Sequence, residues 1–223
     1  ASRQSQGKAI VNLLSLENDE KATSFIPVKG FDDKHYLIMA TKKGIVKKTN
    51  LYAYSNPRKG GIIAINLTKD DSLVNVVLTD GSQQIILATK NGMAVRFDEK
   101  TVRPIGRSGI GVRGVTLRND EIIGMVVASD KSTLLTVTEN GYGKRTNVSD
   151  YRLTNRGGVG VRNIICSERN GSVVSIKSVS DEDDMMFITK NGITIRIPAK
   201  YISVIGRNTQ GARIMKLEEN DKV

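Results

Sequence analysis

The chain has 223 residues and is 39% apolar, which is enough to bury a core. Its 34 Lys and Arg against 23 Asp and Glu give a formal net charge of +11 at pH 7, and it lacks both an apolar run of about 18 residues and a signal peptide. These properties favour a polyanionic partner, nucleic acid rather than a membrane. A single cysteine excludes a disulfide framework and indicates a reducing, cytoplasmic compartment. A single histidine leaves His-dependent catalysis and multi-histidine metal sites unsupported.

The first 36 residues match the second half of a repeat unit whose full copies follow. Residues 3–7 match an Arg-Gly element that recurs downstream, residues 10–16 match the strand after it, and residues 23–28 match a further strand. His35 then falls in a loop before the first full unit. We therefore expect a partial unit over residues 1–36.

Four hairpins are predicted by a recurring eight-residue motif. An apolar run ends in a polar pair and a glycine, as in Leu37-Ile-Met-Ala-Thr-Lys-Lys-Gly44, and a return strand follows. Glycine supplies the positive φ of a tight turn without steric cost. The motif begins at Leu37, Ile85, Leu134 and Met185, and its turn glycines lie 48, 49 and 51 residues apart. This spacing defines a repeat of about 50 residues.

The return strands carry a basic residue at a fixed position. The fourth residue after the turn glycine is Lys48, Arg96, Arg145 or Arg196. Two copies carry a further lysine just before it, Lys47 and Lys144. Because side chains alternate between the two faces of a strand, we expect the fixed cations to emerge at equivalent places on the surface of successive repeats.

An Arg-Gly element with the pattern R-x-x-x-G-x-R follows the later hairpins at residues 107–113, 156–162 and 207–213, and the first repeat has Arg58-Lys59-Gly-Gly61. A third and a fourth strand come after it. Third strands are predicted at residues 62–67, 112–117, 161–166 and 212–217, and fourth strands at 73–78, 122–127 and 173–179. No segment shows a sustained apolar period of 3.6 residues, so little helix is expected.

Four short strands per repeat predict an all-β fold, a propeller-like ring or arc of four-stranded antiparallel blades. Residues 1–223 are predicted to form one domain. It divides into a partial blade at 1–36, repeats at 37–84, 85–133 and 134–184, and a terminal repeat at 185–223.

The cations kept in register predict a binding track for phosphate groups, and the glycines let backbone N–H groups approach them. Only 4% of the residues are aromatic, too few for base stacking, so we expect duplex DNA bound through its backbone, without sequence preference, and bent along the curve. The predicted DNA-contacting residues are Lys47, Lys48, Arg58, Lys59, Arg96, Arg103, Arg107, Arg113, Lys144, Arg145, Arg156, Arg162, Arg196, Arg207 and Arg213.

Other motifs are interpreted without a chemical role. Gly109-Ile-Gly-Val-Arg-Gly114 fits a dinucleotide fingerprint, but a strand and not a helix follows it. The acidic residues 181–184 lack the alternating ligands of a calcium loop and are interpreted as a solvated loop. Cys166 is interpreted as a buried small hydrophobe, and the tyrosines have no neighbouring base. We expect no catalytic site, metal or cofactor in this chain.

The repeats closely resemble the C-terminal β-pinwheel domain of the A subunit of bacterial DNA gyrase, a type IIA topoisomerase. The resemblance runs nearly end to end and is most specific at residues 7–14, 40–48, 61–67, 136–145 and 202–211. The family's first blade carries a Gln-Arg-Arg-Gly-Gly-Lys-Gly box, of which residues 155–160 are a degenerate copy without the lysine. The resemblance thus implies a fragment without the first blade, with weaker wrapping and an open question of ring closure.

The resemblance also implies a function. Domains of this family wrap duplex DNA around their outer rim, so that the whole enzyme introduces negative supercoils with the energy of ATP hydrolysis. The partners implied are duplex DNA, the rest of the gyrase A subunit, and the gyrase B subunit in an A2B2 heterotetramer. ATP, Mg²⁺ and the catalytic tyrosine belong to other domains of that enzyme. The fragment itself is expected to be monomeric, in the bacterial cytoplasm and associated with the nucleoid.

Three alternatives remain. The equivalent domain of topoisomerase IV also binds DNA but has fewer or more degenerate blades, and residues 61–67 and 202–211 favour gyrase. A protein-binding propeller predicts exposed aromatic or apolar hot spots on the ring, in which this sequence is poor. A propeller enzyme predicts a central cluster of carboxylates or histidines, and none is visible in the sequence.

Overall fold

The computed structural model describes residues 16, 20–58 and 60–223, and it confirms the predicted all-β class. Predictions for residues 1–15 lie outside the described residues. The strands are β1 (Tyr36–Thr41), β2 (Ile45–Asn50), β3 (Leu73–Thr79), β4 (Gln84–Thr89), β5 (Met93–Asp98), β6 (Val112–Arg113), β7 (Ile122–Ala128), β8 (Thr133–Thr138), β9 (Tyr142–Asn147), β10 (Val161–Arg162), β11 (Val173–Val179), β12 (Asp184–Ile188), β13 (Thr194–Pro198) and β14 (Ala212–Arg213). Single-turn 3-10 helices follow the hairpins: η2 (Leu51–Tyr54), η3 (Glu99–Thr101), η4 (Val148–Asp150) and η5 (Ala199–Tyr201).

The four predicted hairpins are confirmed as β1–β2, β4–β5, β8–β9 and β12–β13. Each turn places its glycine at positive φ, for example +84° at Gly92. At Gly92 an added Cβ would lie 2.3 Å from the Ile164 carbonyl oxygen, so the next repeat also packs against the turn. The threonine before the turn adds a hydrogen bond, because Thr89 Oγ1 accepts from the Met93 N–H at 3.0 Å.

The fourth strands were also correctly predicted, but the third strands were not. The three four-stranded sheets have the orders β3-β1-β2-β6, β10-β5-β4-β7 and β11-β8-β9-β14. The short strands β6, β10 and β14 are what remains of the predicted third strands, and each pairs with the hairpin of the preceding repeat. Residues 62–67 form no strand, and the described residues contain no hairpin before β1 for them to join. Residues 23–28, predicted as a fourth strand, are also irregular.

The short third strands have a local cause. After β6, the N–H groups of both Gly114 and Val115 turn to the Gly44 carbonyl oxygen, at 2.8 and 3.3 Å. The chain therefore crosses the end of the preceding hairpin instead of continuing along it. The same pair of bonds recurs after β10, where Asn163 and Ile164 donate to Gly92.

Apolar cores fill the spaces between successive sheets. Along β4, Ile85 and Leu87 face the first sheet, whereas Ile86 and Ala88 face the third. The next core joins Leu135 and other residues of the third sheet to the terminal hairpin. Burial on both faces explains why the first hairpin strands are continuous apolar runs and not alternating ones.

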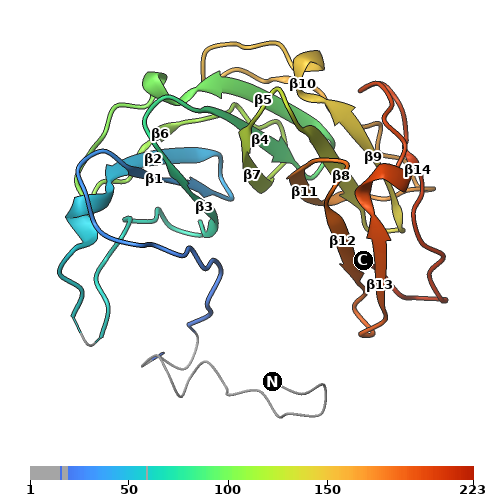
Figure 1. The fold of residues 1–223 in the computed structure, drawn as a ribbon, viewed down its shortest axis with the longest axis horizontal. Helices are drawn as coiled ribbons and strands as arrows, with labels where there is room; N and C mark the ends of the chain where they lie inside the picture. The colour runs from blue at the N-terminus through green and yellow to red at the C-terminus, as the bar shows by residue number, and fades with distance from the viewer. Residues whose placement is uncertain (1–15, 17–19, 59) are drawn as a thin grey trace.

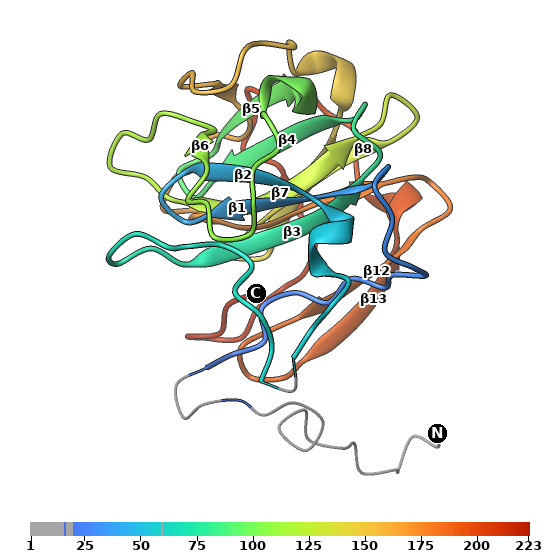
Figure 2. The ribbon, with the colours of Figure 1, turned by 90° about the vertical axis from the view of Figure 1, so that its left-hand side faces the viewer.

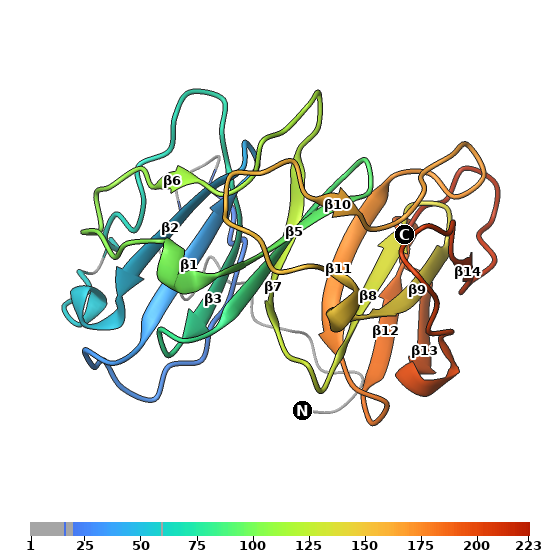
Figure 3. The same cartoon turned by 90° about the horizontal axis from the view of Figure 1, so that it is seen from above.

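The sheets succeed one another along an open arc (Figure 1). Strands β3, β7 and β11 line the concave side, and β6, β10 and β14 lie on the convex side, which we call the rim. From its left-hand side the arc presents the first sheet, and from above the stack of sheets is seen in order (Figures 2 and 3). Among the described residues no helix is long and apolar enough to cross a membrane.

Candidate nucleic-acid interface

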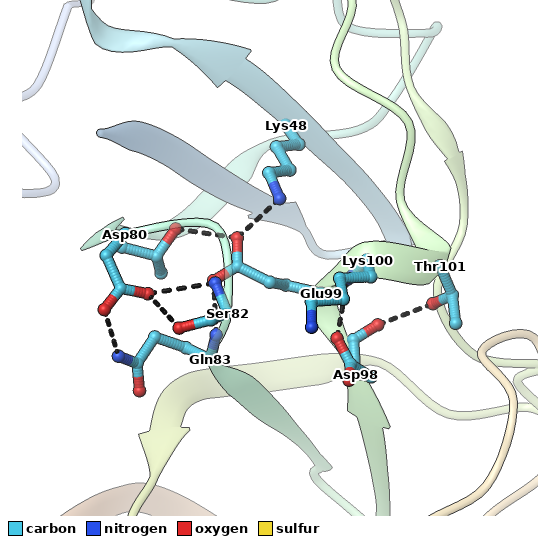
Figure 4. Close-up of polar contacts among 9 residues, drawn as sticks. Lys48, Asp80, Ser82, Gln83, Asp98, Glu99, Lys100 and Thr101 are labelled. Atoms are coloured by element: carbon cyan, nitrogen blue, oxygen red, sulfur yellow. Dashed lines mark hydrogen bonds and ion pairs between the residues drawn. The ribbon is translucent and has the colours of Figure 1, made fainter. Parts of the chain in front are cut away.

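In the three four-stranded sheets the fixed cation after the turn is buried or, at Arg96, nearly buried, so its predicted place on the surface is wrong there. Lys48 is 4% exposed, and its Nζ lies 2.8 Å from Glu99 Oε2 at the start of the next 3-10 helix (Figure 4). Glu99 also accepts from Thr79 Oγ1 at 2.8 Å and from the Gln83 N–H at 2.7 Å. Lys48 therefore joins two neighbouring sheets and is not available to a ligand.

Arg96 and Arg145 make the same kind of junction one and two sheets further on. Arg96 Nη1 donates to the carbonyl oxygens of Val148 and Tyr151, and Nη2 lies 3.0 Å from Asp130. Arg145 Nε donates to the Ile202 carbonyl oxygen at 2.9 Å, and Nη1 pairs with Asp181. The physical reason is that the following repeat lies over the end of each return strand and offers its 3-10 helix carbonyls there.

The terminal hairpin differs. The Arg196 side chain is 70% exposed and pairs with Asp184 across β12–β13. No described repeat follows that could cover it. Of the four fixed cations, Arg196 alone keeps the predicted exposure.

Lys47 and Lys144, which were predicted to contact DNA, are buried as well. Lys144 Nζ donates to the carbonyl oxygens of Gly206 and Arg207 at 2.7 and 2.8 Å. Lys47 Nζ donates to the Ala64 and Arg107 carbonyl oxygens. Burial, with the neighbouring arginine adding a smaller effect, lowers the pKa of each lysine to about 8.

The Arg-Gly elements lie on the rim and are linked to one another. In each, the first arginine reaches back to the preceding repeat: Arg107 donates to the Ile63 carbonyl oxygen at 3.3 Å, Arg156 to that of Arg113 at 3.1 Å, and Arg207 to that of Arg162 at 2.9 Å. The main chains are joined too, since Thr116 N–H donates to the Gly158 carbonyl oxygen at 2.9 Å. These bonds make one continuous edge from repeat to repeat.

The glycines of these elements serve close packing. The N–H groups of Gly61, Gly109 and Gly157 already donate to carbonyl oxygens of the chain. They are therefore not free to bind phosphate, contrary to the prediction from the sequence. An added Cβ at Gly111 would lie 2.5 Å from the Val46 carbonyl oxygen, and one at Gly160 would lie 2.2 Å from that of Ala94. The glycines therefore let the rim segments lie directly against the hairpins of the preceding repeat.

Apart from Arg196, the predicted cations that remain accessible are arginines of the rim loops and strands. Arg58, Arg103, Arg113, Arg162 and Arg213 are exposed, while Arg107, Arg156 and Arg207 are partly buried by their backbone contacts. Lys59 lies outside the described residues. We call this set, with Arg152, the rim cations: Arg58, Arg103, Arg107, Arg113, Arg152, Arg156, Arg162, Arg207 and Arg213.

Sequence reasoning missed three exposed arginines, Arg118, Arg152 and Arg169. Arg152 holds the same place after η4 that Arg103 holds after η3, so comparison of the repeats could have found it. Arg118 and Arg169 lie at equivalent places, four residues before β7 and β11, and Arg169 packs with Arg213 on the Tyr142 ring. Hydrogen bonds that the Arg169 and Arg213 guanidinium groups donate to the Tyr142 hydroxyl oxygen lower the pKa of Tyr142.

Two depressions on the rim combine arginine with glycine. One of about 660 Å³ is lined by Arg58, Gly61, Arg107 and neighbouring residues. The other, about 180 Å³, is lined by Arg152 and by the glycine-rich segment of the next Arg-Gly element. Each places guanidinium groups beside exposed backbone, a combination that suits a phosphate oxygen.

Other candidate chemistry finds little support in the described part of the chain. No three His, Cys, Asp or Glu side chains gather there into a possible metal site. Cys166 is half-buried, and burial raises the pKa of its thiol, as for a packing residue. His35 lies just before β1 as predicted, with Nδ1 2.8 Å from Asp32 Oδ2.

Sequence comparison points to one family. A family model described as the DNA gyrase C-terminal domain, a beta-propeller, matches residues 1–29, 35–80, 83–129, 132–180 and 183–223. Curated relatives include the DNA gyrase A subunit from Halalkalibacterium halodurans, 54% identical over 99% of this chain and 27% of the relative. The A subunit from Salmonella typhimurium is 44% identical over 100% of this chain and 26% of its own length. The chain thus spans about a quarter of the relatives it matches.

Solved structures agree on the fold. The C-terminal domain of a DNA topoisomerase IV superposes with a TM-score of 0.90 at 29% identity, covering 97% of this chain and 68% of that one. A DNA gyrase A C-terminal domain superposes with a TM-score of 0.88 at 27% identity, covering 98% of this chain and 74% of that one. Both similarities extend over nearly the whole chain, so the arrangement of the repeats is shared.

Proposed function

Since the chain belongs to the DNA gyrase C-terminal domain family, we propose that it binds duplex DNA through phosphates along the rim, without sequence preference, and bends the duplex around the arc. The observation that carries the proposal is the continuous edge formed by the Arg-Gly elements. Its exposed arginines recur once per repeat on one side of the molecule, and hydrogen bonds from arginine side chains to backbone carbonyl oxygens of the preceding repeat fix their spacing.

Electrostatics supports a duplex partner. Each phosphate contact releases condensed counterions from DNA, which favours binding by a chain whose net charge is +11. A curved row of cations also offsets the cost of bending, about 1 to 6 kcal/mol for a site of 20–30 base pairs. Lys47, Lys48, Lys144 and Arg145 are buried and Arg96 is nearly so, which removes them from the proposed contacts and leaves the rim cations and Arg196.

The wider role follows from the relatives. Because the chain corresponds to about a quarter of the DNA gyrase A subunit, we infer that it works as part of such a protein, with the gyrase B subunit for a partner, in the bacterial cytoplasm. In that setting the wrapped duplex would be presented to the rest of the enzyme during ATP-driven negative supercoiling. The corresponding role in topoisomerase IV is the second candidate, favoured by the TM-score of 0.90 to its C-terminal domain.

The salt dependence of duplex binding tests the proposal. Arg103, Arg113, Arg152 and Arg162 are replaced together by alanine, and affinity for two unrelated duplexes is measured by fluorescence anisotropy across a salt series. We expect equal losses for both duplexes and a log-log slope reduced by about 0.9 for each phosphate contact removed. Lys177→Ala, which removes an exposed cation from β11 on the concave side, is the matched control. An unchanged slope in the fourfold variant would contradict the proposal.

A further inference from the structure

Lys47 and Lys144 are fully buried ammonium groups surrounded by oxygen acceptors and not by carboxylates. Lys144 Nζ has three acceptors: the Gly206 and Arg207 carbonyl oxygens and, at 3.2 Å, Thr209 Oγ1. A protonated lysine has three N–H donors, so all of them are used. Lys47 reaches the Ala64 carbonyl oxygen at 2.5 Å and that of Arg107. Neither lysine takes part in an ion pair among the described residues.

The two lysines share one target, the first arginine of an Arg-Gly element. Each binds the carbonyl oxygen of that arginine, Arg107 or Arg207. The guanidinium of the same arginine donates to the loop of the preceding repeat, to Ile63 or Arg162. One rim arginine is thus fixed at its backbone by a buried lysine and at its side chain by its neighbour.

The middle repeat achieves the same end differently. The position of Lys47 and Lys144 is occupied there by Val95, which packs in the apolar core. The first arginine of the next Arg-Gly element, Arg156, makes an additional bond from Nε to the Thr101 carbonyl oxygen at 2.9 Å. The lysine is therefore present where the arginine lacks this second bond, which argues that holding the arginine is the role of the lysine.

We propose that Lys47 and Lys144 are positioning residues: without touching DNA, their ammonium groups hold Arg107 and Arg207 in the orientation that contacts phosphate. This inference rests on the proposed function. It also makes duplex binding sensitive to the protonation of the lysines, because a neutral amine has one donor fewer and turns a lone pair toward a carbonyl oxygen.

The charges around each lysine set the pH range. Burial first, and then Arg107, lower the pKa of Lys47 to about 8. For Lys144 burial and Arg207 lower the pKa to about 8, and Asp150 acts in the opposite direction. Duplex affinity should therefore fall between pH 7 and pH 9, a range in which exposed lysines and arginines keep their charge.

The test is a double-mutant cycle on the 223-residue chain, with a fluorescent duplex as the probe. Lys47→Met and Lys144→Met together should weaken binding at pH 7 by about tenfold and remove most of the change between pH 7 and pH 9. In a background of Arg107→Ala and Arg207→Ala, the same lysine changes should have little further effect. Lys177→Met, an exposed lysine on β11, is the control for the substitution itself and should leave the pH dependence intact.

The outcomes separate the two proposals. Equal losses from the lysine changes with and without Arg107 and Arg207 would overturn the positioning role while leaving duplex binding established. If the lysine variant does not fold, the pH series still decides, because the unaltered chain must lose affinity above pH 8 and the Arg107→Ala/Arg207→Ala variant must not. Absence of duplex binding by the unaltered chain would overturn the proposed function and this inference with it.

Discussion

Buried charges at the junctions between sheets are the residues on which the arc most depends. Lys48 and Glu99 have side chains 5% and 0% exposed, and they join the first sheet to the second. Removing one partner of such a pair leaves an uncompensated charge in an apolar setting. An exposed pair such as Lys42 with Glu121 carries no comparable penalty, because water solvates whichever charge remains.

We expect Glu99→Gln to lower the free energy of unfolding by about 3 kcal/mol, because it leaves the Lys48 ammonium without its carboxylate. Urea denaturation measures the change. Lys42→Met, at the exposed pair, is the control and should cost less than about 1 kcal/mol. Equal midpoints for the two variants would show that the junction does not depend on the buried pair.

A second prediction at the residue scale concerns pH. The pKa of Lys144 is about 8 in the folded chain and 10.5 in its ordinary state, so between these values the unfolded chain binds more protons and rising pH favours folding. The unaltered chain should therefore gain stability relative to Lys144→Met from pH 8 to 10.5, by at most about 1.4 kcal/mol per pH unit. Denaturant midpoints of the two proteins across this range measure the gain. A constant difference would mean that the ammonium is not desolvated.

At the scale of the element, a hairpin turn can require glycine for two reasons: a positive φ, and the close approach of a neighbouring segment. Gly192 meets only the first requirement, and Gly92 meets both. Gly92 and Gly192 have nearly equal φ, +84° and +86°. Around Gly92 the Ile164 carbonyl oxygen lies within 2.3 Å of an added Cβ, whereas nothing lies within 4 Å at Gly192. The next repeat covers the turn at Gly92, and nothing described covers the turn at Gly192.

Gly192→Ala should therefore cost about 1 kcal/mol, the strain of positive φ alone, and Gly92→Ala about 3 kcal/mol or more, because the covering segment must move. Thermal or urea unfolding of the two variants measures both values. Similar costs at the two turns would show that the next repeat yields without penalty.

The elements also show what sequence patterns reveal. Hairpins and fourth strands were predicted because the turn glycine and the apolar runs are local signals. The third strands were predicted too long, because after two residues the chain turns to the carbonyl oxygen of the preceding hairpin's glycine, and an apolar run in the sequence does not reveal that contact. Nor does sequence periodicity show that β6 pairs with a hairpin of the preceding repeat. The prediction that Arg145 is exposed was wrong for a related reason. In the sequence, a cation that recurs in every repeat looks the same whether it contacts a ligand or the next repeat.

For the whole molecule, the proposed function requires that the rim cations act along one curve. Nicked circular DNA ligated in the presence of the chain should change its linking number if the duplex follows that curve. The variant lacking Arg103, Arg113, Arg152 and Arg162 should give a smaller change at equal occupancy, and Lys177→Ala should match the unaltered chain. Full occupancy without any change in linking number would limit the chain to binding without wrapping.

Each four-stranded sheet contains one strand from the following repeat, so the boundaries of the sequence repeats do not coincide with the boundaries of the sheets. Insertion or loss of one whole repeat keeps every internal sheet complete. An inserted repeat contributes its short third strand to the sheet of the preceding repeat, and its own sheet is completed by the short strand of the following repeat. A cut elsewhere damages two neighbours at once. Gene duplication can therefore lengthen such a molecule in steps of a single unit, changing the contour offered to DNA while every internal junction keeps its chemistry.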